Sequence, residues 1–216
     1  SFKLQLSQRL QGLEMDDTRV SSTSRRILET LGARGMGLSG LLAMGGTHTA
    51  GAVGFFGSYE LLSKLEDDGN LLVLPIDACD GFLRNLTDSD VDLSKRKADL
   101  LGLKISDDGL QLVPIEVKMY KLGSKEKIVL PAPESSDLDE AVDQVLATKA
   151  ILSEVASTYR TLTSRPSGDQ YRQLWMTNLA TLVETARKLS PRQAKLDAAV
   201  PRLLNRLMTG EANVDV

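Results

Sequence analysis

Residues 97–118 read KADLLGLKISDDGLQLVPIEVK, and this stretch decides the fold. Two apolar runs, over 98–105 and 110–120, lie on either side of Asp107-Asp108-Gly109. An Asp-Gly pair between two apolar runs is the strongest short-range signal for a β-hairpin. We therefore expect two antiparallel strands joined by a tight turn centred on Asp108-Gly109.

With this turn, the hairpin gathers charged side chains on one face. Asp99 faces Lys118 directly, and Glu116 lies two residues along the same strand, so the alternation of side chains puts all three on one side of the sheet. The opposite side is predicted to be apolar, with Val113, Ile115, Val117 and Met119. Charges gathered against an apolar strand pair cost several kcal/mol unless a cation or an opposite charge compensates them.

Two carboxylates at this position suit a hard divalent cation. Mg²⁺ prefers one or two carboxylates with water and a substrate phosphate, and Mn²⁺ can substitute. Asp99 and Glu116 would bind the metal, and Lys118 would orient or deprotonate the attacking water, which indicates phosphodiester hydrolysis. The alternative is a solvent-facing cross-strand ion pair between Asp99 and Lys118, worth a few tenths of a kcal/mol. Asp77 is a competing ligand because we expect it near the end of the preceding strand.

The flanking sequence predicts helices before and after three strands. The first strand is expected over 71–78, and the only candidate for a fourth is 158–165, unless the chain ends before that strand. Helical spacing is expected over 24–44, 49–66, 137–157 and 169–189, and a last helix from Ser190-Pro191. This order indicates an α+β or α/β fold with a small mixed sheet and additional C-terminal helices.

On these residues the chain resembles the PD-(D/E)xK nuclease superfamily, whose core is αβββαβ. The resemblance covers roughly 54–157 and implies that Asp99 and Glu116 are metal ligands and Lys118 is the catalytic lysine. It further places Glu60 where some members carry an extra acidic ligand, and Gln144 where RecB-like members carry a glutamine near the site. The family's Pro-Asp is Ala98-Asp99 here, and Pro114 lacks a donor for the third strand.

The resemblance also suggests a division into segments. We expect an N-terminal helical segment over 1–48, the nuclease core over 49–160 and a basic helical segment over 161–216. Because the chain starts at Ser1 and lacks a Walker lysine, we expect a module of a larger restriction or defence assembly with an ATPase or translocase. The oligomeric state stays open.

The charge distribution favours DNA as the partner, although the chain carries 26 Lys+Arg against 29 Asp+Glu overall. Residues 158–210 hold nine basic and three acidic side chains. A second basic group lies around the hairpin and includes Lys95, Arg96, Lys97 and Lys121. Basic residues around a carboxylate site are what a phosphate backbone requires. An ordinary solvated helix face is the alternative explanation of the C-terminal charge.

Composition excludes several other classes. With one Cys and one His, the chain has no intramolecular disulfide and no multi-cysteine zinc site, and a catalytic triad would have to use His48. No run approaches the ~20 apolar residues that span a bilayer, so we expect no membrane contact and a cytoplasmic location. Gly35 to Gly40 matches G-x-G-x-x-G, but no strand is predicted before it, so a dinucleotide-binding site is not expected there.

A non-catalytic DNA-binding or protein-interaction domain is the alternative to an endonuclease. An exonuclease or Holliday-junction resolvase is a weaker alternative.

Overall fold

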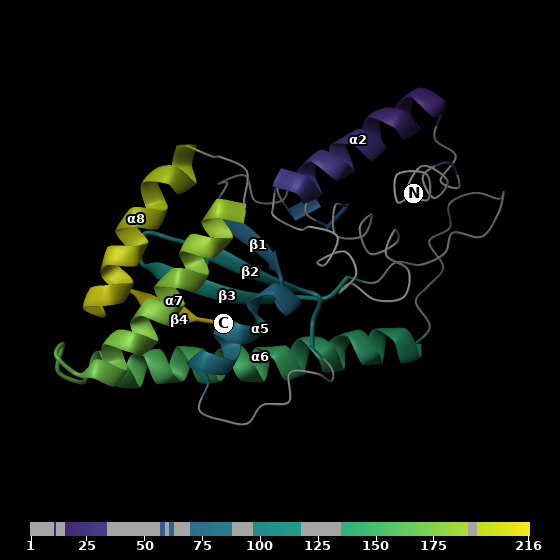
Figure 1. Ribbon diagram of the computed structural model, residues 1–216. Helices are drawn as coiled ribbons and strands as arrows, with labels where there is room; N and C mark the ends of the chain where they lie inside the picture. The colour runs from purple at the N-terminus through teal and green to yellow at the C-terminus, as the bar shows by residue number, and fades with distance from the viewer. Residues whose placement is uncertain are drawn as a thin grey trace. The chain divides into compact units, whose positions relative to one another are not determined.

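The computed structural model describes residues 11, 16–33, 57–58, 61–62, 70–87, 97–117, 135–189 and 194–216 (Figure 1). By its contacts the chain divides into two compact units. The first unit contains Ser1–Lys64 and Val117–Asp139, and the second contains Leu65–Glu116 and Glu140–Val216. Each unit is described separately.

The described part of the first unit is mainly one helix, α2, over Asp17–Ala33. Asp16 caps it, because the Arg19 amide donates to the Asp16 carboxylate at 2.9 Å. Val20, Ser24 and Ile27 are buried and lie on one face of the helix. The helix predicted over 24–44 therefore begins earlier, at Asp17. Of the helix predicted over 49–66, the described residues 57–58 and 61–62 are helical.

In the described part of the second unit, four strands form one mixed sheet in the order β1-β2-β3-β4. The strands are β1 (Leu71–Pro75), β2 (Leu100–Ile105), β3 (Gly109–Ile115) and β4 (Asn213–Asp215). β1 and β2 pair antiparallel, as do β2 and β3, whereas β4 lies parallel to β3. The three successive strands and the mixed α/β class that the sequence predicted are confirmed.

The first strand is shorter than predicted because a helix, α5 (Ile76–Leu86), follows Pro75 immediately. Its buried side chains are Ile76, Cys79, Leu83 and Leu86, which make one helical stripe. The sequence predicted that the strand would continue to residue 78, which lies inside α5. The apolar residues at helical spacing make this segment a helix and not the end of a strand.

The hairpin turn lies one residue earlier than predicted. Ser106 and Gly109 close the turn, with the Ser106 amide donating to the Gly109 carbonyl at 2.9 Å. Gly109 is already the first residue of β3, and an added Cβ there would come within 2.0 Å of the Asn213 carbonyl oxygen. Because Gly109 has no Cβ, β4 can lie close to the start of β3. The turn itself centres on Asp107 and Asp108. This shift changes which residues face each other across the hairpin.

The fourth strand lies at a place that the sequence did not indicate. Residues 158–165 belong to helix α6 (Ser135–Thr163) and the turn after it, so the expectation of a strand there is wrong. β4 instead follows the last helix, after Gly210, whose φ of 85° lets the chain turn back toward the sheet. The expectation that the chain ends before a fourth strand is wrong as well.

Helices α6, α7 (Gln170–Leu189) and α8 (Ala194–Thr209) share one core with the sheet (Figure 1). From the strands, Leu72, Leu74, Leu101, Leu103, Leu110 and Leu112 enter this core. The Trp175 indole donates to the Leu86 carbonyl at 3.1 Å, and its ring lies 6.1 Å from that of Tyr159. The predicted helical stripe is confirmed at Trp175, Leu179, Leu182 and Ala186, which are buried.

None of the helices in the described residues is long and apolar enough to cross a membrane.

Candidate active site

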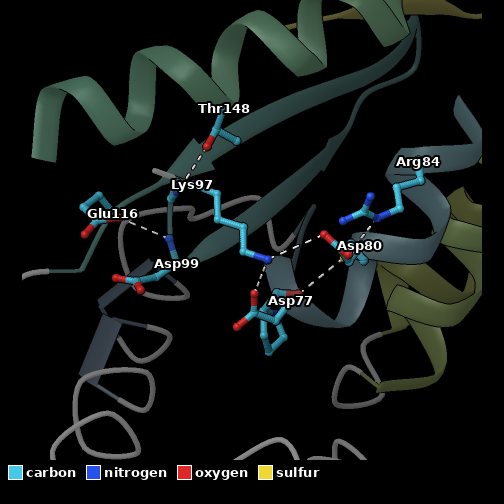
Figure 2. A network of polar contacts seen from close by, with 10 residues as sticks. Asp77, Asp80, Arg84, Lys97, Asp99, Glu116 and Thr148 are labelled. Carbon is cyan, nitrogen blue, oxygen red and sulfur yellow. Dashed lines mark hydrogen bonds and ion pairs between the residues drawn. The ribbon is translucent and has the colours of Figure 1, made fainter. Parts of the chain in front are cut away.

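Asp99 and Glu116 meet at the open end of the β2–β3 hairpin. Leu100 and Ile115 are the last strand pair, so the next residues outward are Asp99 and Glu116. The Asp99 amide donates to the Glu116 carboxylate at 3.2 Å (Figure 2). The corrected register therefore places Asp99 opposite Glu116 and not opposite Lys118. Both carboxylates nevertheless stay on one side, because the register changed by an even number of residues.

That side of the hairpin is the side of the core. Asp99 has the same parity as Leu101 and Leu103, and Glu116 has the same parity as Leu112, all of which are buried leucines of the core cluster. Val113 and Ile115 alternate with Glu116, as predicted, but they are only half-buried. The carboxylates thus lie where the core reaches solvent, with Asp99 exposed and Glu116 half-buried.

Three consecutive residues before β2 are held by helices α5 and α6 (Figure 2). The Lys97 ammonium pairs with Asp77 and, at 3.5 Å, with Asp80, both on α5. The Ala98 amide donates to the Thr148 hydroxyl of α6 at 2.8 Å. The Asp99 carbonyl accepts the Ile76 amide at 2.9 Å, which extends the β1–β2 pairing. Since Ile76 is the first residue of α5, the position of Asp99 is fixed by α5 and α6 together.

The Lys97 side chain forms its ion pairs with α5. It is 24% exposed and contacts Asp77, whereas the sequence indicated that Lys97 would bind DNA. Asp80 also pairs with Arg84 at 3.0 Å, which completes a small charged network (Figure 2). Asp77, the competing metal ligand, begins α5 and does not end β1, and Lys97 neutralises it.

Cys79 lies next to this network as a neutral, buried thiol. Burial, aided by the nearby Asp77 carboxylate, raises the pKa of the Cys79 thiol to about 12. The thiol donates to the Pro75 carbonyl at 3.4 Å. Cys79 therefore acts as a small core residue of α5.

Gln144 lies on α6 exactly one helical turn before Thr148 and is half-buried. Because residues four apart share a helix face, Gln144 lies on the side of α6 that contacts Ala98. The expected role of Gln144 near the carboxylates stays a prediction. Thr148 itself gave no sequence signal, because a threonine within a helix is ordinary.

Several predicted site residues lie outside the described residues. They are Glu60, Lys95, Arg96, Lys118 and Lys121. His48, which was not predicted to belong to the site, also lies outside the described residues. Within the part of the chain that the structure describes, no group of three or more His, Cys, Asp or Glu could hold a metal ion. The Asp99–Glu116 pair alone fits the donor set of Mg²⁺, which needs only one or two carboxylates beside water and substrate oxygens.

Part of the basic C-terminal charge serves the fold. Arg172 is buried and donates to the carbonyls of Arg165 and Thr209. Arg187 forms an ion pair with Asp197. The count of basic residues in the sequence therefore overstates the charge available to a ligand.

Comparison with protein-family models, with curated proteins and with solved structures gives no match for this chain. Its function is therefore argued from its own residues and their geometry.

Proposed function

We propose that this chain is a metal-dependent nuclease that hydrolyses phosphodiester bonds within DNA. Asp99 and Glu116 hold the divalent cation, Mg²⁺ or Mn²⁺, and Lys118 acts on the attacking water. The observation that carries this proposal is that Asp99 and Glu116 lie opposite each other at the hairpin end, where the Asp99 amide donates to the Glu116 carboxylate. A positioned carboxylate pair at the solvent edge of a core is what a catalytic metal site needs.

The order of elements supports the same proposal. A helix precedes β1, three antiparallel strands follow, α6 comes next, and β4 returns parallel to β3. This order is similar to the αβββαβ order that the resemblance to PD-(D/E)xK nucleases implies, and the similarity supports the proposal. Two departures are α5, inserted between β1 and β2, and the pair α7 and α8, inserted before β4.

Each residue has a defined task. The backbone amide of Asp99 orients the Glu116 carboxylate, and α5 and α6 keep Asp99 in place. Lys118 orients or deprotonates the attacking water, and Gln144 positions polar groups beside the site. The bound cation supplies Lewis acidity and lowers the pKa of its water. Glu60 is a candidate for an additional carboxylate.

The larger setting is part of the proposal. A cutting domain without a nucleotide-binding motif fits a module of a cytoplasmic restriction or defence assembly, in which an ATPase or translocase belongs to another domain or subunit. In that setting the duplex is delivered to the carboxylate pair.

Cleavage of supercoiled plasmid tests the function. The full chain is incubated with Mg²⁺, Mn²⁺ or EDTA and compared with Asp99→Asn, Glu116→Gln and Lys118→Ala. Glu184→Gln is the matched control, because Glu184 makes only a surface ion pair with Lys188 at 3.8 Å. We expect nicking that depends on the metal, is lost in the three site variants and is kept in the control. Nicking that survives Glu116→Gln would refute the assigned site.

A second candidate is a DNA-binding or protein-interaction domain that keeps this fold without catalysis. One observation favours it, namely that the described residues supply no third carboxylate or histidine to complete a metal group. Such a domain would bind duplex DNA or a protein partner equally well in the wild type and in Glu116→Gln, and neither would bind Mn²⁺ or cut.

A further inference from the structure

A hollow of about 550 Å³ lies between α8 and the sheet. Its wall on the sheet side includes Asn70, which precedes β1, and Ser106 and Asp107 of the hairpin turn. This turn is at the end of β2 remote from Asp99, roughly 20 Å away at about 3.3 Å per strand residue. The hollow is therefore a separate place on the second unit.

The wall on the α8 side has two long cations with two alanines between them. Lys195 and Arg202 both line the hollow and lie seven residues apart, which is two helical turns or roughly 10 Å along the axis. Ala198 and Ala199 line it between them. Because alanine has only a methyl group, the helix surface there leaves room for a ligand flanked by both cations.

These two cations of α8 differ from the cations near the end of the preceding helix, α7. Arg187 and Lys188 each pair with a carboxylate. Among the described residues, by contrast, Lys195 and Arg202 form no ion pair, and the Arg202 guanidinium donates only to the Ala198 carbonyl of its own helix, at 3.2 Å. Of the charged residues that line the hollow, two are cations, Lys195 and Arg202, and one is a carboxylate, Asp107. The lining therefore carries a net positive charge.

The walls are already fixed to each other. The Arg206 guanidinium of α8 donates to the carbonyl of Asp107, which holds the hairpin turn against the helix. The Asn213 amide of β4 donates to the Asp108 carbonyl at 2.9 Å and secures the same turn from the other side. A ligand that enters the hollow thus meets a site that needs little ordering.

We infer that this hollow binds a phosphate group. Lys195 and Arg202 supply the charge that a phosphate requires, and the side-chain amide of Asn70 supplies a neutral donor for phosphate or sugar oxygens. The phosphate can come from the backbone of a DNA strand or from a free nucleotide. This site goes beyond the proposed cleavage site and does not depend on the carboxylate pair.

Binding measurements in EDTA test this inference without any cleavage. The full chain and the double variant Lys195→Gln/Arg202→Gln are titrated into a fluorescent duplex at several KCl concentrations, followed by anisotropy. A second titration uses dAMP and calorimetry. The matched control is Arg160→Gln/Lys188→Gln, which removes the same charge from exposed positions of α6 and α7. Circular dichroism melting shows that each variant is folded.

We expect the double variant to bind at least one ligand roughly tenfold more weakly, with the control unchanged. If the duplex is the ligand, the slope of log K against log salt also falls by about 1 to 2. A loss restricted to dAMP assigns a free nucleotide instead.

Equal binding of both ligands by wild type and double variant, or no binding at all, overturns the inference. If the double variant unfolds, Ala199→Glu serves as the replacement, since it puts a carboxylate into the hollow. Because no metal is present, failure here leaves the nuclease proposal untouched.

Discussion

The hydrogen bond between α6 and the entry to β2 can be removed by the single substitution Thr148→Val. Thr148 is 1% exposed and Ala98 is 0% exposed, so their 2.8 Å hydrogen bond is inaccessible to water. Valine has nearly the shape of threonine, so the substitution opens little cavity. It leaves the Ala98 amide buried without its acceptor, immediately before Asp99.

The expected cost follows from that buried donor. A buried polar group that loses its partner destabilises a protein by about 1–3 kcal/mol. For a chain of this size, each kcal/mol lowers Tm by about 2–4 °C, so Tm should fall by roughly 2–12 °C.

Urea unfolding measures the effect directly. Trp175 is the sole tryptophan and is buried in the same core, so its fluorescence reports the unfolding of the second unit. Thr161→Val is the matched control on α6, because the exposed Thr161 hydroxyl donates only to the Ser157 carbonyl at 3.1 Å. We expect the control to change stability by no more than about 0.5 kcal/mol. The reasoning is refuted if Thr148→Val matches the wild type as closely as the control does.

Two other predictions concern the sheet and the buried thiol. Gly109→Ala should destabilise the second unit by about 3 kcal/mol or more, because its Cβ would meet the Asn213 backbone at 2.0 Å; Gly168→Ala, with nothing within 4 Å, should be near neutral in the same urea titration. Cys79 should resist a disulfide reagent at pH 8 in the folded protein and react in guanidinium, because burial raises its pKa to about 12. Since the folded pKa lies above the ordinary value of 9.0, the stability that Cys79 contributes is complete below pH 9 and falls above it, by up to about 1.4 kcal/mol per pH unit. Unfolding measured between pH 8 and 10 should show this decline in the wild type and a flatter profile in Cys79→Ala.

The sequence predicted the hairpin but misplaced its turn. The Asp-Gly signal assumes that glycine is needed for the turn itself, whereas Gly109 is needed for the close approach of Asn213 from β4. That contact joins residues about a hundred positions apart, and no local pattern carries it. Asp99 and Glu116 still came out on one side, because a shift of the turn by one residue preserves the alternation of side chains.

The surroundings of the site were harder to predict than the carboxylates. Thr148 and Asp80 act through contacts made by packing α5 and α6 against the start of β2, so their roles depend on tertiary structure. Lys97 looked like one of a run of surface cations, and only the position of α5 shows that it pairs with Asp77. The buried stripe of α7 was predictable, because the spacing of its apolar residues is a local property of one segment of the sequence.

The most direct test of the carboxylate pair is Mn²⁺ binding followed by electron paramagnetic resonance, because it needs neither DNA nor a partner domain. The wild-type chain is titrated with Mn²⁺ alongside Asp99→Asn, Glu116→Gln and the control Glu184→Gln. We expect the wild type and the control to bind Mn²⁺ alike, and each site variant to bind at least about tenfold more weakly, since each loses a charged ligand. Equal Mn²⁺ affinity in the wild type and both site variants would contradict the assignment of Asp99 and Glu116 as metal ligands.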